Sequence, residues 1–221
     1  NGNQGYATGS FFVNSPLFGN FEDFIMYDLL DHVKAEFDVC PDEYAVIGHS
    51  MGGFAAVRLA QKYDNIFKTA IAHSAPLDLK QIEVLIPYVK KENSGNRFDP
   101  SAGVYSFLTY CMSGAMSPNL KKRPFKIDPP FTRDWKINPE VIERWEHFNP
   151  ANNLYINKIE NLYVDVGLRD RFRLYDFTMS FIDSAQKYDQ NYTLVIHPNG
   201  HSDSLAQQLN FSLKYLSAKL R

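Results

Sequence analysis

The chain has 221 residues, 44% of them hydrophobic and 22% charged, which is typical of a globular protein with one substantial core. A net charge of -2 gives no argument for nucleic-acid binding, and no apolar run approaches the roughly 20 residues of a membrane-spanning helix. Two cysteines, Cys40 and Cys111, are too few for a disulfide scaffold or a zinc cluster.

Hydrophobic spacing predicts helices and strands that alternate along most of the chain. Apolar residues recur every four positions over 21–37, which predicts a helix that Pro41 closes, and the short apolar run 44–47 fits a buried parallel strand. The pattern then predicts a helix from residue 54, strands over 67–72, 161–166 and 192–197, and helices over 175–188 and 205–220. This order indicates an α/β fold with a mostly parallel sheet covered by helices on both faces.

Residues 87–153 break this rhythm with many prolines and an unusual density of aromatic side chains. A structureless insertion of that length is improbable in a compact domain unless it is functional. We expect a lid or side wall over the active edge of the sheet. A disordered linker is the alternative, but the aromatic content favours packing.

The strongest motif is GHSMGG at residues 48–53, a G-x-S-x-G pattern centred on Ser50. It follows a predicted strand and opens a predicted helix, which is the context of a nucleophile elbow on a sharp, strained turn. We therefore predict Ser50 as a nucleophile and the backbone N–H of Met51 as one oxyanion donor. The alternative is a glycine-rich turn without chemistry.

A serine hydroxyl needs a base, and six histidines compete for that role. His201 lies in PNGHS (198–202), in a loop after a predicted strand and before the last helix, where the base of such enzymes follows the acid. His197 at the end of that strand is the runner-up, and the elbow should direct the neighbouring His49 elsewhere. For the others a surface or packing role is favoured: His32, His73 and His147.

The acid should follow the preceding strand, where a loop carboxylate can orient the imidazole. Asp170 lies a few residues beyond the strand 162–166, whereas Asp165 is inside it and Asp176 is expected to cap the next helix. Further candidates for substrate contact are His49, Arg169 and Arg171. The arginines could recognise an anionic group, but a solvated basic surface is the commoner role.

With these residues placed, the chain resembles the putative-esterase family of α/β hydrolases, which includes feruloyl and acetylxylan esterases, S-formylglutathione hydrolases and mycolyltransferases. The resemblance rests on GSFFVNS at 9–15, GHSMGG at 48–53, DVGLRD at 165–170 and GHS at 200–202. It implies an α/β-hydrolase fold and one catalytic domain over residues 1–221. Family members begin with several further strands, so the resemblance also implies that N-terminal strands, with a second oxyanion donor, are missing here.

These observations predict a serine carboxylic-ester hydrolase that works through an acyl-enzyme and needs no cofactor or metal. Its substrate would be a small-molecule or carbohydrate-linked ester, and the missing N-terminal segment or another chain could complete the sheet. The alternatives are an acyltransferase of the same fold and a catalytically silent binding module. The compartment is open, with a secreted or cell-envelope location favoured over a cytoplasmic one.

Overall fold

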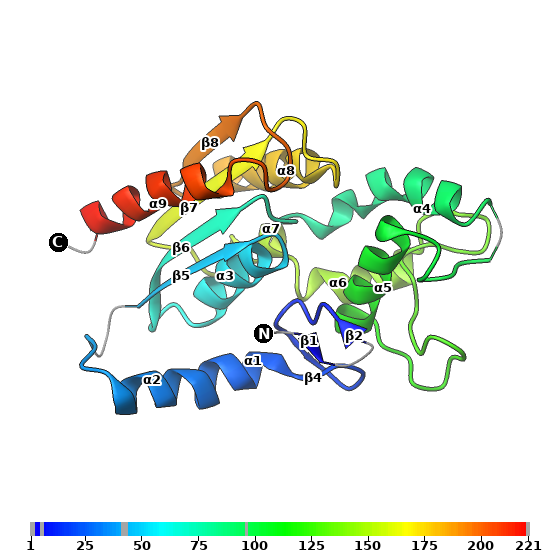
Figure 1. The fold of residues 1–221 in the computed structure, drawn as a ribbon, viewed down its shortest axis with the longest axis horizontal. Helices are drawn as coiled ribbons and strands as arrows, with labels where there is room; N and C mark the ends of the chain where they lie inside the picture. The colour runs from blue at the N-terminus through cyan, green and yellow to red at the C-terminus, as the bar shows by residue number, and fades with distance from the viewer. Residues whose placement is uncertain (1–2, 5–6, 41–43, 96, 220–221) are drawn as a thin grey trace. The chain divides into compact units, whose positions relative to one another are not determined.

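The structure is a computed structural model that describes residues 3–4, 7–40, 44–95 and 97–219, with residues 3–4 and 7–8 described by their backbone alone. The chain forms two compact units (Figure 1). We call Asn1–Pro41 with Ile82–Phe148 the helical unit, and Asp42–Gln81 with Asn149–Arg221 the sheet unit. A single domain with an inserted lid stays a prediction.

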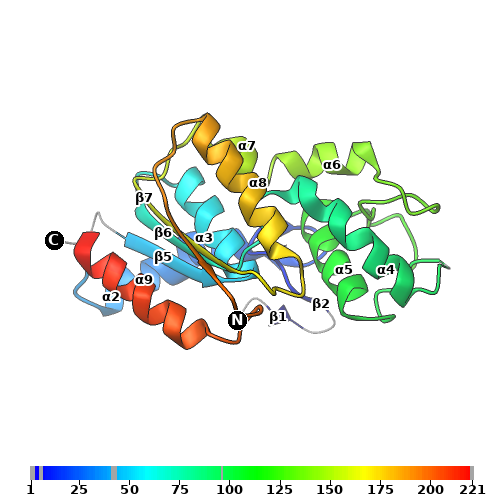
Figure 2. The same cartoon turned by 90° about the horizontal axis from the view of Figure 1, so that it is seen from above.

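The sheet unit is built on four parallel strands in the order β5-β6-β7-β8. The strands are β5 (Tyr44–His49), β6 (Phe67–His73), β7 (Asn161–Gly167) and β8 (Thr193–His197). The helices are α3 (Met51–Lys62), α7 (Pro150–Asn153), α8 (Leu174–Lys187) and α9 (Leu205–Lys219). Figure 2 shows α3, α7 and α8 over one face of the sheet and α9 over the other. The predicted helix-flanked parallel sheet is therefore confirmed.

The core of this unit lies along the two central strands. Ala70, Ile71 and Ala72 of β6 are fully buried, whereas Ile47 and Ile196 on the edge strands are 36% and 41% exposed. A continuous apolar run is what a parallel strand needs when helices cover both of its faces. The central strands thereby form a rigid base for the loops that follow them.

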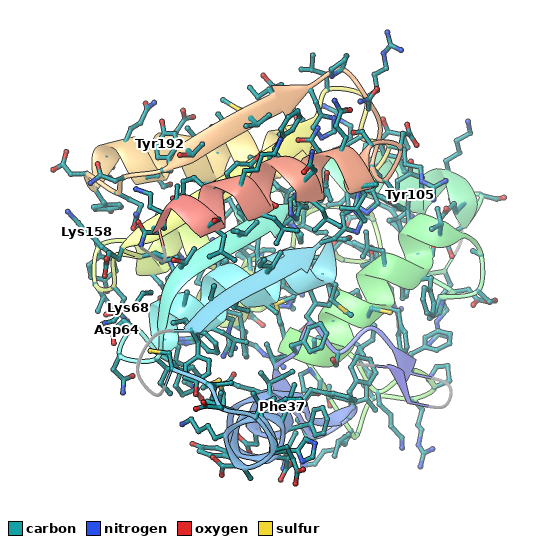
Figure 3. All side chains as sticks on the ribbon, turned by 60° about the vertical axis from the view of Figure 1, so that its left-hand side comes forward. Phe37, Asp64, Lys68, Tyr105, Lys158 and Tyr192 are labelled. Atoms are coloured by element: carbon teal, nitrogen blue, oxygen red, sulfur yellow. The ribbon has the colours of Figure 1, made fainter. Side chains whose placement is uncertain are left out.

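The two ends of the sheet differ in chemistry. Asp64, Lys68 and Lys158 lie at the end where β6 begins (Figure 3), and Lys68 Nζ donates to the Asp64 carbonyl at 2.9 Å. The opposite end carries the loops that contain Ser50, Asp170 and His201. Ligands of open α/β sheets bind outside the carboxyl ends of the strands. All three predicted catalytic residues are at that end.

The helical unit contains four short strands and several helices. Its strands are β1 (Asn3–Gln4), β2 (Ala7–Thr8), β3 (Asn14–Ser15) and β4 (Gly19–Asn20). Its helices are α1 (Phe21–Asp23), the π-helix η1 (Phe24–Leu29), α2 (Leu30–Glu36), α4 (Ile86–Glu92), α5 (Val104–Met116) and α6 (Pro139–Glu146). The 3₁₀ helix η2 (Leu79–Leu85) joins the units along the chain.

The N-terminal helix of this unit differs from the helix that the sequence predicts. The helix expected over 21–37 is helical to Glu36, but it is not one α-helix, because a π-helical stretch, Phe24–Leu29, interrupts it. Hydrophobic spacing cannot distinguish a short π segment from α-helix. Pro41, expected to close this helix, lies outside the described residues.

The region 87–153 is folded. Its aromatic residues pack, as shown by Trp145, which is fully buried and donates its indole N–H to Ser117 Oγ at 2.9 Å. Tyr105 of α5 (Figure 3) stacks on Tyr88 of α4 with ring centroids 4.8 Å apart. A role as a lid stays a prediction. Nowhere in the described ranges is there a helix long and apolar enough to cross a membrane.

Candidate active site

Ser50 occupies a strained turn between β5 and α3. Its φ of 56° and ψ of -118° are costly for a residue with a side chain, by about 1–3 kcal/mol. Two backbone bonds hold it there: Ser50 N donates to the His73 carbonyl at 2.8 Å, and the Ser50 carbonyl accepts from Phe54 N at 3.1 Å. The neighbouring strand and the first turn of α3 therefore impose the strain, and the serine stays partly exposed.

The glycines of the motif have different steric roles. A Cβ atom on Gly48 would lie 2.0 Å from the carbonyl oxygen of Gly52, a distance that no atom pair tolerates. A Cβ on Gly53 would lie 2.8 Å from the Ala75 side chain. A Cβ on Gly52 itself would meet nothing within 4 Å. The elbow therefore requires glycine at position 48 but not, on steric grounds, at position 52.

We expect Gly48→Ala to disrupt the elbow and Gly52→Ala to leave the fold intact. The first change forces β5 and α3 apart, whereas the second replaces a helical glycine, which should stabilise α3 by about 0.5–1 kcal/mol. Thermal and urea unfolding of both variants measure the difference. Equal stability of the two variants would contradict the steric account.

The N-terminus of α3 provides a donor for developing negative charge. Met51 is the first residue of this helix, so its N–H has no acceptor within the helix. The 12 residues of α3 also direct the positive end of their dipole toward the elbow. Met51 N–H therefore has the position and polarity that an oxyanion donor needs.

Asp170 and His201 form a hydrogen-bonded pair. His201 Nδ1 and Asp170 Oδ2 are 2.8 Å apart, and the side chains are 13% and 0% exposed respectively. Asp170 Oδ1 accepts from Phe172 N at 2.8 Å, which fixes the plane of the carboxylate. An ionised Asp170 accepts the Nδ1 proton, so Nε2 is left as the basic nitrogen.

The loops that carry this pair are tied together by close backbone contact. Leu168 N donates to the His197 carbonyl at 2.8 Å, and Arg169 N donates to the Asn199 carbonyl at 3.1 Å. A Cβ atom on Gly167 would lie 2.3 Å from the Asn199 carbonyl oxygen. Only glycine at the end of β7 therefore allows the Asn199 loop to approach closely enough to bring His201 to Asp170.

His49 links the elbow to the loop of His201. Its Nε2 donates to the His201 carbonyl at 2.9 Å, and the two imidazole rings lie 4.6 Å apart. The structure describes both Ser50 and His201, and no hydrogen bond joins their side chains. In enzymes without substrate, the bond between nucleophile and base is often long and shortens when substrate binds. The His49 side chain, expected to point elsewhere, therefore lies where it can hold the loop of His201 beside the elbow, and no spacing pattern in the sequence predicts this contact.

Burial lowers the pKa of His49 below its ordinary value of 6.5, against the opposing effect of its bond to the His201 carbonyl. The unfolded chain therefore takes up this proton at a higher pH than the folded protein does. We expect a loss of folding stability as the pH falls below about 6.5. His49→Gln, which cannot titrate, should lose less stability between pH 7.5 and 5.5, as urea unfolding would measure.

Two substitutions of His49 form a matched pair that tests the effect of its hydrogen bond on activity. His49→Gln keeps a side-chain N–H in reach of the His201 carbonyl, whereas His49→Phe keeps the ring and removes the donor. We expect the phenylalanine variant to lose about 2- to 10-fold in kcat/KM, the effect of one neutral hydrogen bond, and the glutamine variant to lose less. Equal losses would exclude positioning through this bond.

A second histidine–aspartate pair lies on the α9 side of the sheet. His73 Nδ1 is 2.5 Å from Asp165 Oδ2, and His73 Nε2 is 3.1 Å from Ser212 Oγ of α9. All three side chains are buried, with exposures of 2% or less. No substrate reaches a serine so enclosed, so this set anchors α9 to β6 and β7. The runner-up base His197 is also directed to this cluster, with Nε2 3.9 Å from Asp165 Oδ1.

The arginines after β7 differ in their contacts. Arg171 lies over the ring of Phe172, with 4.8 Å from its guanidinium carbon to the ring centroid, and that ring packs edge-on against His201. Arg169 is exposed. Asp176 does not cap α8 as expected, because the helix begins after Arg173; its carboxylate instead accepts from the Arg173 guanidinium at 2.8 and 3.1 Å.

None of the His, Cys, Asp and Glu side chains that the structure describes gather in threes as metal ligands. The groups that converge at the carboxyl ends of the strands are therefore a serine, an imidazole–carboxylate pair and a helix N-terminus. This arrangement is suited to nucleophilic attack on a carbonyl carbon with general-base assistance.

The chain is similar in sequence or structure to several known proteins. Over 64 residues the chain is 41% identical to Esterase Rv1288 of Mycobacterium tuberculosis, a match that spans 28% of this chain and 14% of that protein. FphF, a fluorophosphonate-binding serine hydrolase of Staphylococcus aureus, has a similar structure (TM-score 0.59, 17% identity, 93% of this chain and 67% of that one). So does the capsule O-acetyltransferase of Neisseria meningitidis serogroup A (TM-score 0.56, 10% identity, 95% and 69%).

The structural neighbours establish the α/β-hydrolase fold. The sequence profile of one family, described as Putative esterase, matches residues 11–201, which includes Ser50, Asp170 and His201. The chain therefore belongs to the Putative esterase family.

Proposed function

We propose that the protein is a serine carboxylic-ester hydrolase. The observation that carries the proposal is the combination of Ser50 on a strained elbow with the hydrogen-bonded pair of His201 and Asp170 at the same end of the sheet. Family membership and the identity with a named esterase support the same reaction class. The substrate class is a small-molecule or carbohydrate-linked ester.

In the proposed mechanism His201 Nε2 takes the Ser50 hydroxyl proton as Oγ attacks the ester carbonyl. The resulting oxyanion accepts from Met51 N–H. His201 then protonates the leaving alcohol, which leaves an acyl group on Ser50. Water, deprotonated by His201, attacks this acyl-enzyme, and the acid departs while Ser50 recovers its proton. Asp170 holds the tautomer and stabilises the imidazolium throughout, and no cofactor takes part.

Two residues, Arg169 and Arg171, are proposed contacts for substrate rather than for the reacting atoms. Arg169 and Arg171 flank the acid, and Arg171 reaches the base through the Phe172 ring, so an anionic substituent on the substrate would suit this position. His49 would act on the substrate only indirectly, through the loop of His201.

A direct test is hydrolysis of p-nitrophenyl acetate, butyrate and octanoate by the purified protein. Saturable release of p-nitrophenol with an initial burst is expected if an acyl-enzyme forms. If the folded protein released no p-nitrophenol from all three esters, the result would contradict the proposal and favour a binding module.

Acyl transfer is a second candidate, favoured by the structural likeness to an O-acetyltransferase that was solved in complex with CoA. Both reactions share the acyl-enzyme and differ in what attacks it. Product analysis with p-nitrophenyl acetate and a sugar acceptor separates them. Free acetate as the main product supports hydrolysis, and acetylated sugar supports transfer.

A further inference from the structure

The helical unit contains a cavity of about 660 Å³, and the described residues that line it all come from the region between α4 and α6. This volume is within the range of about 300–1,000 Å³ that small-molecule sites occupy. Its described lining combines aromatic rings with cationic side chains and has no acidic residue. None of the proposed catalytic residues belongs to it.

The aromatic side of the cavity is a fixed surface. Phe131 and Trp135 have ring centroids 4.9 Å apart, and Phe98 packs edge-on against Phe131 at 5.5 Å. These rings rest on the buried residues Ile86 and Val89 of α4. Since packing on α4 holds these rings in place, a flat apolar ligand face would meet a preorganised wall.

Trp135 lies at a left-handed turn position, as eight other described residues besides glycine do. The turn joins Phe131 to Ile137, and Trp135 adopts a φ of 65°. Glycine or asparagine would adopt this conformation with less strain, so the backbone does not explain a tryptophan here. Its indole N–H donates to the Gly95 carbonyl at 3.3 Å, which orients the ring.

Three of the four cationic side chains in the described lining of the cavity have no carboxylate partner among the described residues. Arg97, Arg123 and Arg133 are exposed, and no described carboxylate pairs with any of them. A fourth cation, Lys122, is bound to Asp128 at 3.0 Å. Three exposed guanidinium groups around one cavity give it a positive charge that an anionic ligand would offset. In a chain with a net charge of -2, this local excess is not a property of the whole surface.

We infer that this cavity binds an acidic saccharide, a pyranose ring that carries a carboxylate. The C–H face of a pyranose packs on the electron-rich face of an aromatic ring, and its hydroxyls point outward to polar groups. A carboxylate matches the planar fork of a guanidinium in a bidentate bond. Polyphosphate sites are built mainly from backbone N–H groups of glycine-rich loops, whereas the cations here are side chains.

The test is calorimetric titration of the protein with a tri-galacturonate and with the uncharged galactose trisaccharide. Ser50→Ala serves as the host, so that a failure of the proposed esterase activity does not affect the result. We expect saturable binding of the charged oligomer, at least about tenfold weaker binding of the neutral one, and weaker binding at higher salt.

Variants locate the site. Arg133→Gln should weaken binding about tenfold, as loss of a charge-assisted bond does, while Lys214→Gln on α9 removes the same charge elsewhere and should change nothing. Trp135→Gly removes the ring and relieves the strained φ, so it should abolish binding while circular dichroism shows a folded protein. Arg133→Gln, on an exposed residue, remains informative if the glycine variant misfolds.

Several outcomes would overturn the inference. Equal affinity for the charged and neutral oligomers would exclude recognition of the carboxylate. Unchanged binding in Arg133→Gln would place any site elsewhere. Binding of 4-hydroxycinnamate at this cavity, without binding of tri-galacturonate, would show that it takes aromatic acids instead.

Discussion

Replacing Ser50 with alanine is expected to lower kcat for p-nitrophenyl ester hydrolysis by at least about 10⁴-fold, because the proposed acyl-enzyme forms on the Ser50 hydroxyl. The residual rate would come from binding and from the oxyanion donor alone. Among the described residues, the Ser50 hydroxyl has no hydrogen-bond partner. Ser50→Ala should therefore leave the free energy of unfolding nearly unaltered. Steady-state kinetics and thermal unfolding measure the two quantities.

Ser212→Ala is the matched control, since Ser212 also lies beside a histidine–aspartate pair. It is buried, so we expect activity to be retained and stability to fall by about 0.5–1.5 kcal/mol through the lost hydrogen bonds. If Ser212→Ala lost the activity and Ser50→Ala kept it, the assignment of the nucleophile would be wrong.

Asp170→Asn is expected to lower kcat by about 10⁴-fold while leaving KM nearly unchanged. The asparagine amide can donate to His201 Nδ1, and this reverses the tautomer so that Nε2 carries the proton and can no longer act as a base. The bond from Phe172 N to the side-chain oxygen can persist, so the loop should keep its shape. The measurement is kcat against pH for both proteins.

Asp176→Asn is the control for this change, six residues along the same segment. Its carboxylate pairs with Arg173 on the surface and not with a histidine, so we expect activity within about twofold of the unaltered protein. Comparable losses in the two variants would mean that the segment as a whole, and not the carboxylate beside His201, matters for catalysis.

The sequence was informative wherever a local backbone pattern decides the structure. The strand, elbow and helix around Ser50 follow from small residues at fixed positions. Gly48, for example, must be glycine because the carbonyl oxygen of Gly52, only four residues away, leaves no room for a Cβ atom. The four strands and the helices between them were likewise predicted, within a few residues, from apolar runs and periodic spacing. Chain order together with position in loops after predicted strands favoured Asp170 and His201, which the fold brings together.

The features that could not be predicted from the sequence depend on contacts between segments that are far apart along the chain. The bond from His49 to the loop of His201 joins residues 152 positions apart, and no spacing rule encodes it. The cluster of His73, Asp165 and Ser212 needs the register of two strands and the rotation of α9. The cationic cavity could not be predicted from the sequence either, because the folding of the loops around α5 brings Arg97 and Arg133 to the same cavity.

Labelling with a fluorophosphonate probe tests the central claim most directly, because it reports an activated serine without knowledge of the substrate. Mass spectrometry of the labelled protein should find one adduct, on the peptide that contains Ser50. Both Ser50→Ala and His201→Ala should abolish it, while Ser212→Ala should not. An adduct on another serine, or none on a protein that is demonstrably folded, would contradict the account.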